Sequence, residues 1–260
     1  MLIDTHAHLD FKEYDKDRAE VIQRAFDNGV EKIITIGCSL ERSQAAVDLA
    51  QKYDNVYASI GIHPDDIKEL GDSSALEKLY ALGKQEKVVA VGEIGLEYFQ
   101  VEDEKVKKAQ IKGFREQLNL AKELELPVIL HCRDAYQEML EILKSDGAVK
   151  GKARGVVHCF LGNKEIARQL VDLGYYLSFT GIITFKNATD ILPVVKEAPL
   201  EKIMVETDCP YLAPEPNRGK RNEPAYVRQV AERVASIKEV GMDKIEEITT
   251  KNAINLFNLK

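Results

Sequence analysis

Eight short apolar runs alternate along the chain with segments whose apolar residues recur at helical spacing. Nearly continuous apolar runs, such as VVAVG and PVIL, are typical of parallel strands that are covered on both faces. Eight strand–helix units in 260 residues predict a (β/α)8 TIM barrel, an α/β fold of one domain spanning residues 1–260. The predicted strands are Leu2–Thr5, Lys32–Gly37, Val56–Ile62, Val88–Glu93, Pro127–His131, Gly155–His158, Tyr175–Phe179 and Ile203–Thr207.

The segments between these runs are predicted to be helices. One extends from about Asp15 to Asn28 and ends at Gly29, a residue type that tolerates the positive φ of a helix C-terminus. A second extends from about Glu104 to Glu125, and a third carries Val227 and Val234 on one apolar face. An open doubly wound sheet is the alternative. That fold usually has fewer strands and a glycine-rich first turn, whereas the first turn here reads DTHAH.

The composition is that of an ordinary globular protein, with 45% hydrophobic and 30% charged residues, which excludes disordered and fibrous classes. No apolar run approaches the roughly 18 residues that span a bilayer, and no basic region precedes an apolar stretch at the amino terminus. We therefore expect a cytoplasmic protein with no membrane association and no obligate protein partner. The net charge of −7 argues against non-specific binding to nucleic acid, although it is compatible with a local basic patch.

The four cysteines are widely spaced and form no CxxC pair, so we expect them to be reduced. Cys132, Cys159 and Cys209 each directly follow a His or an Asp. Because successive residues of a strand face opposite sides, these three are expected to pack away from any site as small apolar residues.

All five histidines lie at the carboxyl ends of predicted strands, where a barrel assembles its active site. His6 and His8 follow the first strand, His63 follows the third, His131 ends the fifth and His158 ends the sixth. A single histidine is more often structural than functional. Five histidines on one rim of a barrel instead favour a common site.

Two carboxylates lie on the same rim, because Glu93 ends the fourth strand and Asp208 follows the eighth. A lone strand-end carboxylate often caps the next helix. The imidazoles expected on the same rim instead favour a role for these two carboxylates as metal ligands. The His-x-His pair places two imidazoles on the same side of an extended segment, within reach of one cation. Mixed imidazole and carboxylate ligands predict a site for divalent metal ions, with Zn, Mn, Mg and Ni all open.

Six potential ligands exceed the four that one tetrahedral ion needs, so the sequence predicts a binuclear site with two divalent metal ions. Glu93 is the expected bridge, with the first histidine pair on one ion and the pair from the fifth and sixth strands on the other. Asp208 completes the first ion's ligands and accepts a proton from the attacking water, so Glu93 and Asp208 are the predicted catalytic residues. The predicted metal ligands are His6, His8, Glu93, His131, His158 and Asp208.

Several segments resemble the TatD-type metal-dependent deoxyribonuclease family: LIDTHAHLD, GEIGLEY, PVILHCRDA, GVVHCF and VETDCPYLAPEPNRGKRNEP. The resemblance is collinear from residue 2 to the C-terminus. The HxH opening occurs across metal-dependent barrel hydrolases, whereas the final run is much more specific. The resemblance implies a TIM barrel, divalent metals and phosphodiesterase activity on DNA, and by motif position it implies the same six ligands.

The sequence departs from the family pattern at two places. Glu97 stands where the family usually has Asp after GEIGL, and we expect this to alter the surroundings of the metals or the fit of the substrate without removing a ligand. Gln137 stands where an acidic residue is common after HCRDA, and we expect it to affect helix capping or surface charge more than catalysis.

Further rim residues are expected to contact the substrate. Arg133 shares the strand side of His131, where a guanidinium can hold a phosphate bidentately; a salt bridge to a ligand carboxylate is the alternative. His63 is expected to contact the substrate or handle a proton instead of binding metal. Glu206 is expected to orient a ligand imidazole from behind, and an ordinary buried ion pair is its alternative.

The segment Asp208–Pro224 carries four of the eight prolines and a basic cluster of Arg218, Lys220 and Arg221. A charge cluster is usually a solvated surface. Because this one follows the strand that carries Asp208, we expect the three side chains to bind phosphates of the substrate.

The predicted function is hydrolysis of DNA phosphodiester bonds, at single strands or frayed ends, with 3′–5′ exonuclease action as the leading expectation. Three alternatives stay open at this point: a D-aminoacyl-tRNA deacylase, a hydrolase of small phosphoesters, amides or esters, and a metal-binding protein without catalysis. The small-amide alternative is weakened by Glu93, since related barrels often place a modified lysine after the fourth strand.

Overall fold

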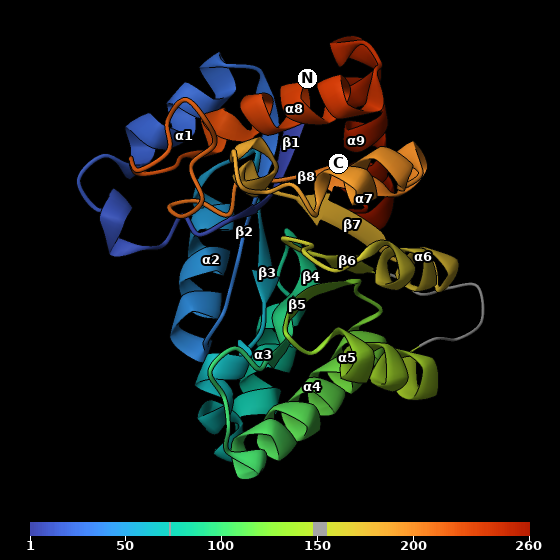
Figure 1. The fold of residues 1–260 in the computed structure, drawn as a ribbon. Coiled ribbons are helices and arrows are strands. Elements are labelled where there is room, and N and C mark those ends of the chain that lie inside the picture. Colours follow the sequence, from blue (N-terminus) through green and yellow to red (C-terminus); the bar gives the residue numbers. More distant parts are fainter. Residues whose placement is uncertain (73, 148–154) are drawn as a thin grey trace.

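The computed structural model describes residues 1–72, 74–147 and 155–260. In these residues, eight strands form one parallel sheet in the order β1 to β8, and helices surround it (Figure 1). The strands are β1 (Leu2–Ala7), β2 (Val30–Thr35), β3 (Val56–Ile60), β4 (Val88–Glu97), β5 (Val128–Arg133), β6 (Gly155–Val157), β7 (Tyr176–Phe179) and β8 (Ile203–Val205). The predicted TIM barrel is confirmed.

The helices that follow the strands also lie where the sequence predicts them. The segment after β1 forms α1, and Gly29 just beyond it has a φ of +84°, as expected for a residue that ends a helix. The helices are α1 (Arg18–Asp27), α2 (Leu40–Lys52), α3 (Ala75–Gly83), α4 (Glu104–Leu124), α5 (Tyr136–Ile142), α6 (Lys164–Asp172), α7 (Leu192–Glu197), α8 (Val227–Lys238) and α9 (Met242–Phe257). None of these described helices is both long and apolar enough to pass through a bilayer.

The last strand returns to the first, which closes the barrel. Thr5 Oγ1 donates to the Val205 carbonyl oxygen at 3.1 Å, and the Asp208 amide donates to the His6 carbonyl oxygen at 2.9 Å. The buried Asp4 carboxylate accepts from the Thr207 amide at 2.9 Å and from the Thr207 hydroxyl at 2.6 Å. Asp4 therefore ties the first strand to the segment after the eighth.

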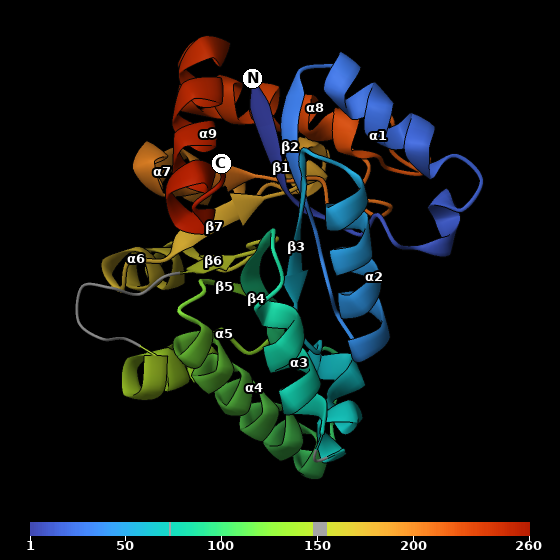
Figure 2. The ribbon, with the colours of Figure 1, turned by 180° about the vertical axis from the view of Figure 1, so that it is seen from behind.

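Two apolar clusters hold the barrel together. One lies between the strands and the surrounding helices, and it includes the predicted apolar face of α8 with Val227 and Val234. The other fills the barrel interior with inward-facing strand residues such as Ile34 and Met204, and Phe257 of α9 packs against it. Helix α9 covers the amino-terminal end of the strands (Figure 2), so the opposite, carboxyl end is the open one.

Candidate metal centre

Six polar side chains from five strands and the turns after them meet at the open end of the barrel, where the sequence predicts them. His6 and His8 come from β1 and the turn after it, Glu93 from β4 and His131 from β5, while His158 directly follows β6 and Asp208 lies three residues after β8. Most of this set is buried: His6 is fully inaccessible, and Glu93 is 4% exposed. A buried polar cluster of this kind is costly unless each group has a partner, and a bound cation would be such a partner for all of them.

The Glu93 carboxylate lies at the middle of the cluster. Its Oε1 atom lies 2.9 Å from His131 Nδ1 and 2.9 Å from His158 Nε2. Its Oε2 atom lies 3.3 Å from His6 Nε2 and 3.9 Å from His8 Nε2. Each oxygen therefore faces one histidine pair, and these are the pairs that the sequence analysis assigned to separate ions.

Asp208 joins the first of these pairs. Its Oδ1 atom lies 3.4 Å from His8 Nε2 and 3.6 Å from His6 Nε2, while the two Nε2 atoms lie 3.3 Å apart. Asp208 has a φ of 57°, a left-handed conformation that Asp adopts more readily than most residues. Two imidazole nitrogens and two carboxylate oxygens thus converge on one small volume.

The donor atoms fit divalent cations. Ligand atoms bound at about 2.0–2.1 Å lie about 3.0–3.4 Å apart around an octahedral or tetrahedral ion. Most separations within each histidine pair and its carboxylate fall in or close to that range, from 2.9 to 3.6 Å. Groups of His6, His8 and Glu93, and of His63, Glu93 and His131, have donor atoms within 4.8 Å of one another. The cluster can therefore hold metal.

Ionisation of the carboxylates favours the same conclusion. Burial alone would raise the pKa of the Glu93 carboxyl, but the charge of His158 and the hydrogen bonds of His131 and His158 hold it well below its usual range. Burial also opposes ionisation of Asp208, and the hydrogen bond of His8 together with the charges of His8 and His158 outweighs it, so the pKa of Asp208 is lowered. Both carboxylates are therefore ionised and can serve as ligands to a cation.

Further carboxylates stand behind the second histidine pair. Glu97 Oε2 lies 3.0 Å from His131 Nε2, on the side of the ring away from Glu93. Glu206 Oε1 lies 3.4 Å from His158 Nδ1 and accepts a hydrogen bond from the Cys159 amide at 2.7 Å. A carboxylate behind a ligand imidazole fixes the orientation of the ring. Glu206 therefore lies where the sequence analysis expected it.

His63 lies against the cluster but differs from the other histidines. Its Nε2 atom is 3.5 Å from Glu93 Oε1, and its ring meets that of His131 edge-on at a centroid distance of 4.4 Å. Its Nδ1 atom accepts a hydrogen bond from the Asp65 amide at 3.2 Å. Burial lowers the pKa of His63 to about 3, so the ring is neutral and its single proton sits on Nε2. In this arrangement His63 presents an Nε2–H donor beside Glu93.

A cavity of about 710 Å³ opens over the centre. Arg133 lines it, with its guanidinium stacked 3.6 Å above the ring of Phe99, and both side chains are exposed. Arg133 thus shares the strand face of His131, as predicted, and within the described residues it forms no salt bridge with a ligand carboxylate. The lining residues include His8, His63, Glu93, Glu97, His131, Arg133, His158, Leu161 and Asp208.

The basic cluster after β8 lies elsewhere, which corrects the sequence prediction. Arg221 binds both carboxylate oxygens of Asp17, at 2.8 and 2.6 Å, and its guanidinium lies over the Tyr14 ring. The Arg218 guanidinium lies 4.2 Å from the Phe185 ring centroid, and the Lys220 side chain is exposed. None of these three side chains lines the cavity over the centre. Of the three, Arg221 is held against Asp17 at the start of α1.

Several residues of the cavity were assigned no role, or a different one, by the sequence analysis; Cys132, for example, was expected to pack away from the site but lines the cavity. Glu97 was placed beyond the fourth strand, although the alternation in EIGLE continues the strand and puts Glu97 on the side of Glu93. Cys159 was expected to pack outward, but β6 ends at Val157, so strand alternation does not apply to it, and Cys159 lines the cavity. Cys38, after β2, lines it as well.

The motifs, the barrel and the geometry of the centre all agree with one family, and its model matches residues 3–258 under the description TatD related DNase. The chain belongs to the TatD family. It is therefore a member of a family of metal-dependent hydrolases, and the predicted family is confirmed.

Similar proteins span the whole chain. A metal-dependent hydrolase of Bacillus subtilis (strain 168), YabD, is 46% identical over 100% of both chains. The 3′-5′ ssDNA/RNA exonuclease TatD of Salmonella typhimurium is 32% identical, covering 99% of both chains. The crystal structure of YJJV, a TatD homologue from Escherichia coli K12, superposes with a TM-score of 0.92 at 33% identity, covering 100% of this chain and 98% of the other.

Proposed function

We propose that this TatD-family hydrolase is an exonuclease that hydrolyses DNA phosphodiester bonds from the 3′ end, using two divalent metal ions that share Glu93. The observation that carries the proposal is the position of the Glu93 carboxylate, with one oxygen toward His6 and the other toward His131 and His158. A carboxylate between two sets of imidazoles is suited to bridge two cations about 3.5–4 Å apart.

Each residue of the centre has a distinct task in this proposal. His6, His8 and Asp208 would hold one cation, and His131 and His158 would hold the other. Divalent cations in such a pair lower the pKa of a water molecule and neutralise charge on a phosphate. Asp208 faces the open cavity and is ionised, so it accepts the proton that the attacking water loses.

Two further side chains position the phosphodiester. Arg133 stands exposed at the cavity wall, and its guanidinium geometry matches phosphate oxygens. His63 presents an Nε2–H donor beside Glu93, where it can donate a hydrogen bond to a phosphate oxygen as negative charge develops there. Arg218, Lys220 and Arg221 take no part, because they do not line this cavity.

A nuclease is favoured over the other hydrolases for two reasons. A full-length relative at 32% identity carries the name 3′-5′ ssDNA/RNA exonuclease. The cavity also offers a cationic group beside the centre, as a phosphodiester requires, because Arg133 is exposed there. The strand ends of DNA are the expected substrate, and no protein partner is needed for the reaction.

The test is a time course with 3′- and 5′-end-labelled oligonucleotides, single- and double-stranded, using protein stripped of metal and supplied with Zn, Mn, Mg or Ni. We expect stepwise release of mononucleotides from the 3′ end that depends on added metal. Glu93→Ala should abolish release while the protein stays folded, and Glu123→Ala, at an exposed carboxylate of α4, should behave as wild type.

Two results would contradict the proposal. Normal turnover by folded Glu93→Ala protein would exclude this centre as the site of catalysis. Failure of wild type on every nucleic acid, with turnover of aminoacyl-tRNA or of small phosphoesters, would assign the metal centre to a different substrate.

A further inference from the structure

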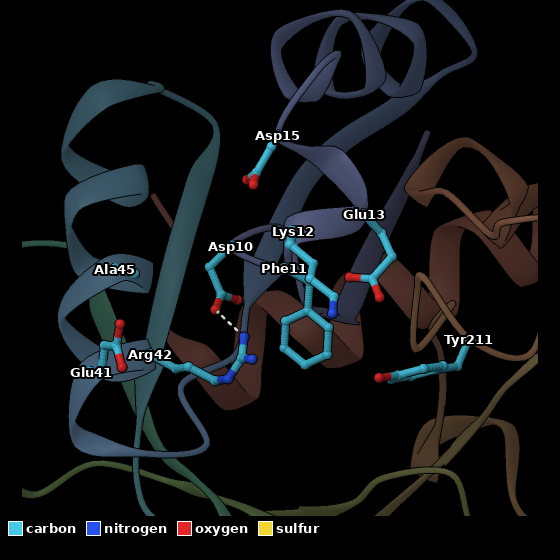
Figure 3. A pocket seen from close by; sticks show the side chains of 9 residues that line it. All are labelled: Asp10, Phe11, Lys12, Glu13, Asp15, Glu41, Arg42, Ala45 and Tyr211. Carbon is cyan, nitrogen blue, oxygen red and sulfur yellow. Dashed lines mark hydrogen bonds and ion pairs between the residues drawn. The ribbon is translucent and has the colours of Figure 1, made fainter.

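A second cavity, of about 500 Å³, adjoins the cavity over the metal centre (Figure 3). Three side chains line both cavities and form the wall between them: Phe11, Arg42 and Tyr211. Its volume is within the range of small-molecule sites, which is about 300–1,000 Å³. The second cavity therefore has the size and the position to receive a part of the substrate that extends from the centre.

The shared wall is built by three neighbouring segments of the barrel. Phe11 follows β1, Arg42 lies in the first turn of α2, and Tyr211 follows β8. The Arg42 guanidinium lies 4.0 Å from the Phe11 ring centroid, and the Tyr211 ring meets Phe11 edge-on at 5.9 Å. Figure 3 shows the Phe11 ring between the other two side chains. The wall is thus a row of flat groups.

Contacts on the buried side hold this row in place. The His8 ring lies 4.7 Å from the Phe11 ring, which couples the wall to a predicted metal ligand. Arg42 donates to Asp10 Oδ2 at 2.8 Å, and the Asp10 side chain is only 4% exposed. Tyr211 in contrast is 53% exposed, an unusual environment for a large aromatic residue. The wall is preorganised, and one face of it is left free.

The charges around the second cavity do not suit a phosphate. Four carboxylates line it, those of Asp10, Glu13, Asp15 and Glu41, against the two cations Lys12 and Arg42. A further phosphate would be repelled here, whereas a nucleobase is neutral and its exocyclic amino groups can donate to carboxylates. Aromatic rings and guanidinium planes stack on bases without regard to their sequence.

We propose that this second cavity is a subsite for the base of the terminal nucleotide, stacked on Tyr211 with Phe11 at its edge, while its phosphate lies at the metal centre. The proposal rests on the proposed nuclease function and gives that function its preference for strand ends. Because the carboxylates beyond the base disfavour another phosphate, the strand ends in this cavity and its remainder leaves past Arg133.

The first experiment measures binding without turnover. Metal-loaded protein is titrated calorimetrically with 2′-deoxyadenosine 5′-monophosphate and, separately, with 2-deoxyribose 5-phosphate, which lacks the base. Wild type should bind the nucleotide about 5- to 150-fold more tightly, the range expected for stacking of one base. Tyr211→Ala should reduce this ratio toward one, and Tyr211→Phe, which keeps the ring, should retain most of it.

Tyr80→Ala is the matched control, since Tyr80 is a partly exposed tyrosine of α3 with a lysine over its ring and does not line either cavity. It should bind both ligands as wild type does. Phe11→Ala tests the other ring, and its fold is checked by circular dichroism because Phe11 contacts His8. An unchanged ratio in Tyr211→Ala overturns the proposal, since that side chain is too exposed for its loss to unfold the protein.

The second experiment separates this subsite from the nuclease function itself. Oligonucleotides with a normal or an abasic 3′-terminal residue are compared as substrates of wild type and Tyr211→Ala. Wild type should show a KM about 5- to 150-fold higher on the abasic end, and the variant should show little difference between the two substrates. Equal discrimination by both proteins contradicts the subsite. If wild type cleaves neither oligonucleotide, the nuclease function fails, and the binding titration still decides the subsite.

Discussion

The carboxylate of Glu97 lies directly behind His131, with Oε2 3.0 Å from His131 Nε2 and the opposite ring nitrogen, Nδ1, 2.9 Å from Glu93. An ionised carboxylate accepts hydrogen bonds only, so the Nε2 atom of His131 carries the proton that it shares with Glu97. With a cation bound beside Glu93, the lone pair of Nδ1 would face that cation while Nε2 keeps its proton for Glu97. Glu97 therefore selects the ring form of His131 that can bind metal.

Replacement of Glu97 is predicted to weaken metal binding without removing a ligand. Glu97→Ala should lower metal affinity about 10- to 100-fold, the usual effect of losing a partner behind a ligand histidine. Glu97→Gln should lose less, because its amide oxygen still accepts from His131. Competition with a chromophoric chelator measures the affinity, and equal affinity in wild type and Glu97→Ala would show that Glu97 does not orient the ring.

The His63 and His131 rings meet edge-on, yet substitutions of these two residues are predicted to have different effects. His63→Ala should keep the metal content of wild type, because its Nδ1 accepts from Asp65 and its Nε2 carries a proton. Loss of its hydrogen bond to the substrate should lower kcat/KM about 10- to 100-fold. His63→Gln should restore part of that loss, since it keeps a donor.

Elemental analysis and steady-state kinetics on the same preparations distinguish these roles. His131→Ala serves as the comparison, and it should lose metal as well as activity. If His63→Ala protein also loses metal, then His63 is a ligand and its predicted role as a substrate contact is wrong.

The fold and the histidine cluster could be predicted from sequence because each follows from a local pattern. Every strand of the structure overlaps a predicted one, since parallel strands buried on both faces appear as apolar runs. Once the strands are located, the carboxyl ends of a barrel meet on one rim, and the positions of His6, Glu93 and His158 follow. The grouping of ligands around Glu93 is therefore a consequence of topology.

The features that sequence analysis missed depend on packing between distant loops. Phe11 and Tyr211 come from two separate loops and Arg42 from the first turn of α2, and no spacing rule brings them together. Arg221 illustrates the opposite case. Its position after β8 suggested a substrate contact, but the fold of that loop brings it to Asp17 at the start of α1. Which partner a charged loop residue finds cannot be read from its place in the chain.

Arg221 is accordingly predicted to contribute to stability and not to substrate binding. The hydrogen bond of Arg221 lowers the pKa of Asp17. An acid whose pKa is lowered by folding contributes stability above its unfolded pKa of about 3.9, and this stability is lost as the pH falls through the lower folded value. Arg221→Ala should therefore reduce the free energy of unfolding by about 0.2–1 kcal/mol near pH 7, where this partly exposed pair is screened by solvent.

The difference in the free energy of unfolding between Arg221→Ala and wild type should narrow as the pH falls below about 4. Asp17 is then protonated in the unfolded chain and increasingly in the folded one. Urea denaturation at several pH values measures it, and Asp17→Asn should reproduce the neutral-pH effect. A raised KM for oligonucleotides in Arg221→Ala, with unchanged stability, would instead restore Arg221 to the substrate site.

Removal of metal is predicted to destabilise the folded protein, because the ligands converge only in the native state. A metal that binds only the native state stabilises it by about 2.7 kcal/mol when its free concentration is 100 times its Kd. Chelation should therefore lower Tm, and added divalent metal should restore it.

In Glu93→Ala this response should be much smaller, since the residue that faces both histidine pairs is gone. Differential scanning calorimetry with and without chelator measures the shift, and Glu123→Ala controls for loss of a carboxylate elsewhere. An equal metal-dependent shift in Glu93→Ala and wild type would mean that the stabilising ions bind outside this centre.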